Sequence, residues 1–475
     1  MRALCVEMGR GLRLILLVGL GIVTANAASG ADVGPSVDQL LEELTDPEAQ
    51  VTVAQDQRST AAVKLTGVSG AAVDPLLAAL PDAGPEVRRR ATWTLGEIQD
   101  ARAIPALAKE LRSPNSFVAS AAALALSKVG RPAIDALVEA LDSERAEVRM
   151  RAVQALGRIG SPAAVEPLAK MLSDKDLGVQ LRAIWSLGKI KQPRGVESLL
   201  GALASEDPRV RAHAVWALGE IGEPAVGPLI ASLAKEALHA REAAAEALAA
   251  IGRPALAPLG AALQHENASV RAHAAQALGI IGEAQRGPAS VLQELLGDPN
   301  GDVRAWSAWA FGTIAGTRAV DPLKGLLRDQ DADVRRLAAK GLGATRDPRA
   351  VEPLLAVLQD EAAAVRLAAV NALGRIKDER AVEAVARALE DADSRVRVAA
   401  ARALGRIKAP AAIEPLIAAM SDTYAPVGYN ANAALQEITG HTVDIPLGWR
   451  AEWIGTYRQP KWEAWWEGNK AKFER

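Results

Sequence analysis

Apolar and polar positions along this chain follow a unit that recurs about every 31 residues. The stretch from Val396 to Ile407 shows the second half of the unit, in which Val, Ala, Leu and Ile recur at helical spacing. A valine opens the same stretch at positions 87, 118, 148, 179, 210, 270, 303, 334, 365, 396 and 427. Ala240 fills the slot between 210 and 270, and a degenerate first copy begins at Gln57, which makes thirteen copies. A fixed period of this size is typical of a solenoid.

Each unit contains two predicted helices. The stretch from Ala350 to Leu358 is a short amphipathic helix with Pro353 near its start, where a helix tolerates proline. A polar turn follows, often with an Asp three residues before the valine, where its carboxylate can cap the second helix. The sequence therefore predicts an all-α fold, an α-solenoid (superhelix) of about thirteen two-helix repeats.

Units that read Ala-Val-Glu-Pro-Leu, and later Val-Arg-x-x-Ala-x-x-Ala-Leu-Gly-x-Ile, resemble HEAT repeats. More narrowly, they are similar to the short HEAT-like type first associated with phycobilisome lyases. The resemblance covers about residues 36–440 and implies a helical solenoid, in a family of scaffolds, adaptors and a few enzymes. Deoxyhypusine hydroxylase shares this repeat type, but its metal site needs several His-Glu dipeptides, and only His265-Glu266 occurs here.

The first 27 residues read as a signal peptide. Three arginines precede an apolar run over 14–23, and Ala25-Asn26-Ala27 supplies the small residues of a cleavage site. The run is too short to span a bilayer, which needs about 20 residues, so we expect no stable membrane span after cleavage; an uncleaved anchor is the alternative. Residues 28–35 are a short leader. The single cysteine, Cys5, lies in the signal segment, and we expect an exported, periplasmic or secreted bacterial protein.

An arginine follows the valine in most units, on the apolar side of the predicted helix. We call these residues the Arg ladder: Arg88, Arg149, Arg211, Arg241, Arg271, Arg304, Arg335, Arg366 and Arg397. A cation in that position needs a partner. We expect acidic turn residues of the same or the adjoining unit to pair with it and so to tie the repeats together; a ligand-binding role is the alternative.

Tryptophan marks the outward face of four second helices. The sixth position after the valine holds Trp93, Trp185, Trp216 or Trp309 in these units and polar residues in others. One turn earlier stand Arg90, Arg182, His213 and Trp306. A cation beside a Trp forms an amphipathic anchor of the kind that interfaces favour. We predict that these eight residues form a partner-binding wall on the concave face. The alternatives are that each Trp only covers the adjacent helix, or that the face holds a small-ligand site.

Half of the ten tryptophans lie in the last 27 residues: Trp449, Trp453, Trp462, Trp465 and Trp466. The last repeat of a solenoid has an open apolar flank, and a Trp-rich helix could close it. We therefore predict that residues 441–475 form a capping segment; a separate partner-binding role is the alternative. The ending resembles the tails of other exported bacterial HEAT-repeat proteins.

Charge and the lack of catalytic motifs argue against several classes of function. The formal charge of −2 argues against a nucleic-acid partner. The sequence has no Cys pair, phosphate loop or nucleophile elbow, and His213 and His273 lie two units apart, so we expect no catalytic residue, metal or cofactor. The preferred interpretation is a non-enzymatic scaffold or adaptor that binds a protein of unknown identity. The alternative is a lyase-like or chaperone-like accessory factor acting on a cofactor-bearing protein, for which an absorbing ligand should copurify. A third interpretation is a purely structural envelope spacer, which predicts no specific partner.

Overall fold

The computed structural model describes residues 39–40, 66–67, 69–235, 237–282, 288–443 and 454–473. In these ranges the chain is helical, with short 3₁₀ turns and no strand. The predicted signal peptide (1–27), the leader (28–35) and nearly all of the degenerate first repeat lie outside the described residues. The chain divides into two compact units, Met1–Ile98 and Gln99–Arg475.

Each of the twelve repeats from α4 to α27 consists of a short first helix and a longer second helix, as predicted. The first helices are α4 (Val73–Ala79), α6 (Ile104–Leu111), α8 (Ile134–Ala140), α10 (Val165–Lys170), α12 (Val196–Ala202), α14 (Val226–Ser232), α16 (Leu256–Ala262), α18 (Ala289–Glu294), α20 (Val320–Leu326), α22 (Val351–Ala356), α24 (Val382–Arg387) and α26 (Ile413–Ala419). The second helices are α5 (Pro85–Ile98), α7 (Ser116–Val129), α9 (Ala146–Ile159), α11 (Leu177–Ile190), α13 (Pro208–Ile221), α15 (Leu238–Ile251), α17 (Ala268–Ile281), α19 (Gly301–Ala315), α21 (Ala332–Thr345), α23 (Ala363–Ile376), α25 (Ser394–Ile407) and α27 (Ala425–Thr439). A last helix, α28 (Ile454–Asn469), follows them.

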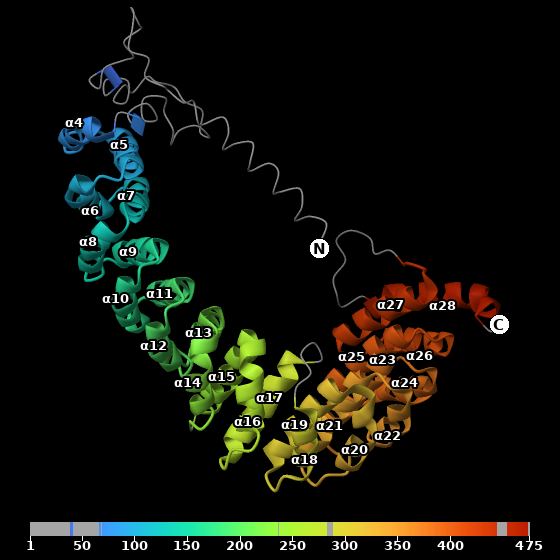
Figure 1. The fold of residues 1–475 in the computed structure, drawn as a ribbon. Helices are drawn as coiled ribbons and strands as arrows, with labels where there is room; N and C mark the ends of the chain where they lie inside the picture. The colour runs from blue at the N-terminus through green and yellow to red at the C-terminus, as the bar shows by residue number, and fades with distance from the viewer. Residues whose placement is uncertain are drawn as a thin grey trace, which may run out of the picture. The chain divides into compact units, whose positions relative to one another are not determined.

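In the second unit, the odd-numbered helices lie next to one another in one layer, and the even-numbered helices form the other (Figure 1). The apolar arc of the second helix faces the layer of first helices. In α25, for example, Val396, Ala400 and Leu404 are fully buried. The predicted all-α solenoid is therefore confirmed.

Local chemistry explains where the second helices begin. The Asp three residues before the valine accepts a backbone N–H bond at the helix start, for example Asp393 from Arg395 at 2.8 Å and Asp331 from Asp333 at 2.8 Å. This is the N-cap role predicted for it, and it satisfies a donor that the first turn leaves unpaired.

A glycine near the end of the second helix lets neighbouring repeats approach closely. A Cβ added at Gly343 would lie 2.6 Å from Ala372 Cα, and one at Gly374 would lie 2.8 Å from Ala403 Cα. These distances are too short for any side chain without a shift of backbone. The Ala-Leu-Gly part of the unit is thus a packing motif that joins one repeat to the next.

Candidate functional site

The stacked tryptophans of α11 and α13 form the most developed aromatic contact on the second-helix layer. The rings of Trp185 and Trp216 are nearly parallel, with planes 10° apart and centroids 6.5 Å apart. Both side chains are half-buried. The structure therefore brings together two of the predicted wall residues from neighbouring repeats.

Two cations complete this group. Arg182 Cζ lies 5.4 Å from the centroid of the Trp185 ring. Lys189 Nζ lies 5.9 Å from the Trp185 centroid and 5.2 Å from the Trp216 centroid. A cation at this range from an aromatic face contributes about 0.5–1 kcal/mol when it is exposed. We call Arg182, Trp185, Lys189 and Trp216 the Trp185 cluster.

The Trp216 ring lies against the preceding repeat. A Cβ on Gly188 would lie 2.9 Å from Trp216 Cζ3, so the ring rests on the backbone of α11. His213, predicted to stand beside this ring, has its Nδ1 2.8 Å from the Arg209 carbonyl oxygen. Trp216 thus packs against its neighbour and still presents part of its surface to solvent.

Trp306 and Trp309 on α19 form a different arrangement. Their rings meet edge to face with centroids 5.7 Å apart, and both pack against the buried Val334 and Leu337 of the next repeat. Lys340 Nζ lies 4.0 Å from the Trp309 centroid. Both rings of this pair lie on one helix, whereas the Trp185 cluster joins two helices.

The remaining predicted wall residues, Arg90 and Trp93, belong to α5 of the first unit. Trp93 is half-buried. Arg90 is buried, with 7% of its surface exposed, and its Nε donates to Glu86 Oε1 at 2.8 Å. Outward orientation was therefore the wrong expectation for Arg90, because its ion pair with Glu86 lies close against the helix.

The Arg ladder pairs with the following repeat at six positions. Each of these guanidinium groups meets an Asp that lies 25 or 27 residues later, in the turn of the next unit. The pairs are Arg149–Asp174 (2.6 Å), Arg271–Asp298 (3.0 Å), Arg304–Asp329 (2.9 Å), Arg335–Asp360 (2.7 Å), Arg366–Asp391 (2.7 Å) and Arg397–Asp422 (2.7 Å).

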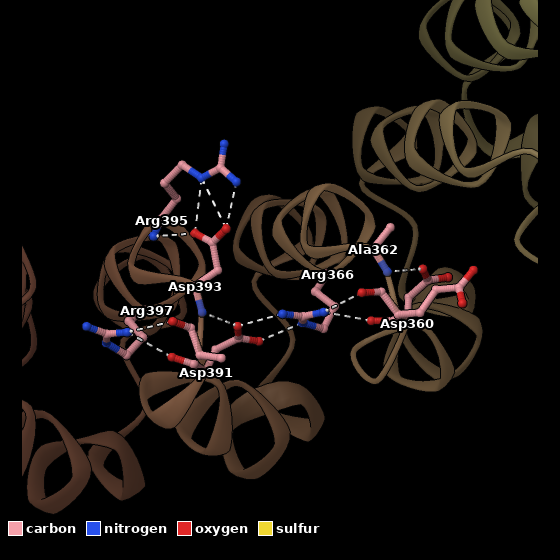
Figure 2. A network of polar contacts seen from close by, with 9 residues as sticks. Asp360, Ala362, Arg366, Asp391, Asp393, Arg395 and Arg397 are labelled. Carbon is pink, nitrogen blue, oxygen red and sulfur yellow. Dashed lines mark hydrogen bonds and ion pairs between the residues drawn. The ribbon is translucent and has the colours of Figure 1, made fainter.

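Figure 2 shows how completely one of these pairs is bonded. Arg366 donates through Nε and Nη2 to the two carboxylate oxygens of Asp391, at 2.7 and 2.8 Å. Its Nη1 donates to the carbonyl oxygen of Asp360 at 2.8 Å. Asp391 also accepts the backbone N–H of Asp393 at 2.8 Å. Hydrogen bonding from Arg366, against the cost of burial, lowers the pKa of Asp391.

The other three ladder residues differ. Arg88 lies half-buried on α5 of the first unit. Arg211 donates to the Ser205 carbonyl oxygen at 2.7 Å, and Glu236, 25 residues later, lies outside the described residues. Arg241 donates to the Lys235 carbonyl oxygen at 3.1 Å, while its buried Nε has no hydrogen-bond partner among the described residues.

The C-terminal helix α28 packs against α26 and α27. Trp462 is fully buried, and its Nε1–H donates to Asn432 Oδ1 at 2.9 Å. Trp466 is 7% exposed, and its Nε1–H donates to Glu414 Oε1 at 3.1 Å. The Trp465 ring stacks on His441 with centroids 4.7 Å apart. Trp449 and Trp453 lie outside the described residues.

Sequence spacing within one helix did not identify every cation that contacts the tryptophans of the second helices. Lys189 follows Trp185 by one turn and was detectable, but Lys340 contacts Trp309 from the next repeat.

The described residues contain no group of three or more His, Cys, Asp or Glu side chains arranged to hold a metal ion. None of the helices in the described ranges combines the length and the apolar character that crossing a membrane requires.

The architecture and the contacts between repeats define an α-solenoid of two-helix units. The sequence matches the family described as HEAT repeats in six overlapping segments that together span residues 73–436. The chain therefore belongs to the HEAT repeat family. The narrower phycobilisome-lyase type stays a prediction.

The fold is similar to those of several longer solenoid proteins. These include crystal structures of Kap121p (13% identity, TM-score 0.49, covering 85% of this chain and 53% of that chain) and of importin beta (17%, 0.40, 85% and 61%). A third is Kap95p, whose binding is described as inducing the GTP-bound conformation in RanGDP (15%, 0.44, 85% and 67%). This chain thus spans between about half and two thirds of their length, and at these identities the likeness concerns the fold alone. A comparison with curated proteins found no match.

Proposed function

We propose that this protein is a non-enzymatic scaffold that binds one or more protein partners along the layer of second helices. The observation that carries the proposal is the half-exposed stack of Trp185 and Trp216 with cations beside it. Large aromatic side chains combined with arginine are the residues on which protein interfaces most depend. We expect the concave wall predicted from the sequence to be the binding surface.

The surroundings of the Trp185 cluster favour a protein over a nucleic acid. Lys189 and Lys191 lie 3.9 and 3.0 Å from Glu220 Oε2, so the local positive charge is partly balanced. The formal charge of the chain is −2. A polyanion would lack the basic stripe that its binding requires, whereas a protein surface can combine apolar contact with a few ion pairs.

Site-specific crosslinking followed by affinity measurement tests this proposal. A photoreactive residue at Ala212, exposed on α13, should capture a partner in the native cell, and the same residue at Ala261 on α16 serves as the control position. The purified partner should then bind the variant Trp185→Ala/Trp216→Ala about tenfold or more weakly than the parent chain.

Phe117→Ala is the matched control for that variant, because it removes another aromatic side chain, 72% exposed, from a second helix. Circular dichroism should show unchanged helicity in both variants. Unchanged affinity for the partner captured at Ala212, with helicity intact, would refute the proposed role of the cluster.

We also propose that the protein is exported, to a periplasm or out of the cell. The basic, apolar and small-residue pattern of residues 1–27 supports this. Cell fractionation with N-terminal sequencing of the recovered protein tests it, and a start just after Ala27 is the expected result. Recovery of the chain with its first 27 residues attached would count against cleavage.

A further inference from the structure

Five cations line the C-terminal ends of three consecutive second helices, α21, α23 and α25. We call them the basic row: Arg346, Arg375, Lys377, Arg406 and Lys408. All five are exposed. None of them forms an ion pair or a side-chain hydrogen bond with any residue that the structure describes.

Three other exposed arginines of the same repeats are each paired with an Asp. Arg349 lies 2.8 Å from Asp347, Arg380 lies 2.7 Å from Asp378, and Arg395 lies 2.6 Å from Asp393. These arginines sit two residues after an Asp, which holds them in place. No residue of the basic row has an Asp two positions before it.

The backbone marks three of the five positions as unusual. Arg346, Lys377 and Lys408 have φ of 53°, 63° and 64°, in the left-handed region, where a side chain costs free energy that glycine avoids. Other repeats place a glycine here, such as Gly160 and Gly440. The field of the helix C-terminus favours a cation, but that field is present equally in the repeats that use glycine.

Four of the five residues of the basic row line an open pocket. The pocket has a volume of about 430 Å³ and is lined by Arg346, Gly374, Arg375, Ile376, Lys377 and Arg406. A second depression of about 160 Å³ continues from it through Arg406 toward Asn430 and Glu437. The first pocket is lined by cations and backbone without a carboxylate, and the second ends at one.

We propose that the basic row binds an extended acidic segment of a protein partner, with carboxylates at every third residue. Neighbouring second helices lie about 8–10 Å apart. In a polyproline II segment every third side chain points the same way, and three residues span about 9 Å. Each carboxylate can therefore meet the cations of one repeat. Arg375 and Arg406 offer the planar fork that binds a carboxylate with two hydrogen bonds.

A short acidic peptide suits this site better than a nucleic acid does. The run of cations covers only three repeats and ends beside Glu437, so it is short for a longer polyanion. The inference rests on the proposed scaffold function, since it gives the chemistry of one partner segment. It uses residues other than the Trp185 cluster, so the two can fail separately.

Peptide binding to the full chain tests the inference. The probe is a short fluorescent peptide with three glutamates at every third position, and its isomer with the three glutamates adjacent is the spacing control. Anisotropy at low salt should show binding of the spaced peptide that is several-fold tighter than that of the isomer. Because the contacts are ionic and exposed, binding should weaken strongly between about 50 and 300 mM salt.

The variant Arg375→Gln/Lys377→Gln/Arg406→Gln should lower affinity for the spaced peptide about tenfold or more. The matched control, Arg318→Gln/Arg328→Gln/Arg387→Gln, removes the same charge from exposed residues outside the row and should have little effect. Equal loss in both variants, indifference to glutamate spacing, or tighter binding of duplex DNA or of anionic vesicles through the same three residues would overturn the inference.

The results also separate the two proposals. Normal capture of a partner at Ala212 with no row-dependent peptide binding would refute the basic row alone. Row-dependent peptide binding, with a captured partner indifferent to the Trp185→Ala/Trp216→Ala change, would refute the role of the Trp185 cluster alone.

Discussion

Residues 99–282 and 288–439 are built from the same two-helix repeat, but their repeats are joined differently. From Arg271 to Asp422, every repeat is connected to the next by a ladder pair. Before Arg271, the only such pair is Arg149–Asp174 among the described residues. Gln180 occupies the arginine position in the next repeat, where its Nε2 donates to the Asp174 carbonyl oxygen at 2.6 Å.

No described ladder pair joins the two repeats that carry the Trp185 cluster. The guanidinium groups of the ladder pairs are largely buried, with at most 17% of the side chain exposed, so they join repeats without being available to a partner. The stack of Trp185 on Trp216 also joins two repeats, but on a surface that solvent can reach. The comparison teaches that an aromatic contact can serve both packing and recognition, whereas the buried ion pair serves packing alone.

Low pH should produce the largest difference in stability between the two regions, because protonation of the ladder aspartates removes the negative charge that pairs with each arginine. Hydrogen bonding from Arg366 lowers the pKa of Asp391, and for Asp360 the hydrogen bonds from Arg335 and the Ala362 N–H outweigh a burial cost that acts the other way. A lowered folded-state pKa gives stability that is complete above the unfolded value of about 3.9 and is lost as pH falls through the folded value.

Amide hydrogen exchange, corrected for the intrinsic rate at each pH, should therefore show greater loss of protection in α21–α25 than in α13–α15 between about pH 5 and pH 2.5. The α13–α15 segment is the internal control because no ladder pair is described between these repeats. Equal loss in both segments would mean that the ladder pairs add no stability of their own.

Trp462→Ala should cost about 3–5 kcal/mol, because it removes a fully buried ring and leaves Asn432 Oδ1 without its donor. The variant tests whether α28 protects the C-terminal end of the ladder region against unfolding. Exchange should increase first in α26 and α27. Trp465→Ala, at a half-buried position of the same helix, is the control and should cost less. An unchanged unfolding transition in the Trp462 variant would rule out a capping role.

The sequence allowed the need for a ladder partner to be predicted, but not the whole wall. The helical position of Arg366 required an acidic partner, and the spacing of 25 residues to Asp391 recurs in four other pairs, so the partner could have been identified. The contact of Lys340 with Trp309 could not, because it depends on how two repeats are registered. Arg90 shows the opposite error, since helical position alone does not reveal that Glu86 holds it against the helix.

Arg335→Met should cost about 3 kcal/mol, because Asp360 is left buried without its counter-ion. Arg211→Met, where the described partners are only carbonyl oxygens, should cost about 1 kcal/mol. Repeat arrays do not unfold as one unit, so local exchange and urea titration by circular dichroism should be measured together. The double variant Arg335→Met/Asp360→Leu should regain most of the loss, and its failure to do so would show that more than charge is involved.

Gly343→Ala should destabilise by about 1–3 kcal/mol, because its Cβ would lie 2.6 Å from Ala372 Cα and only a backbone shift can relieve the clash. The same change at Gly219 meets Ala250 Cβ at 3.0 Å, which is a milder contact. Urea unfolding of both variants compares how much stability each region loses when a methyl group is added between its repeats. A larger effect at Gly219 would show that the region without ladder pairs is the more closely packed one.

Lys377→Gly should raise stability by about 0.5 kcal/mol, the smallest effect of the series. Relief of the left-handed backbone at φ 63° is worth about 1 kcal/mol, and the lost attraction of the cation to the helix C-terminus offsets about half of it. Gly440→Ala, at a position where φ is 70°, is the reciprocal control and should lower stability. If Lys377→Gly gains stability and binds the spaced acidic peptide less tightly, the lysine is kept for recognition. A loss of stability would show instead that the helix end itself needs the cation, and that the basic row is part of the packing that distinguishes this region.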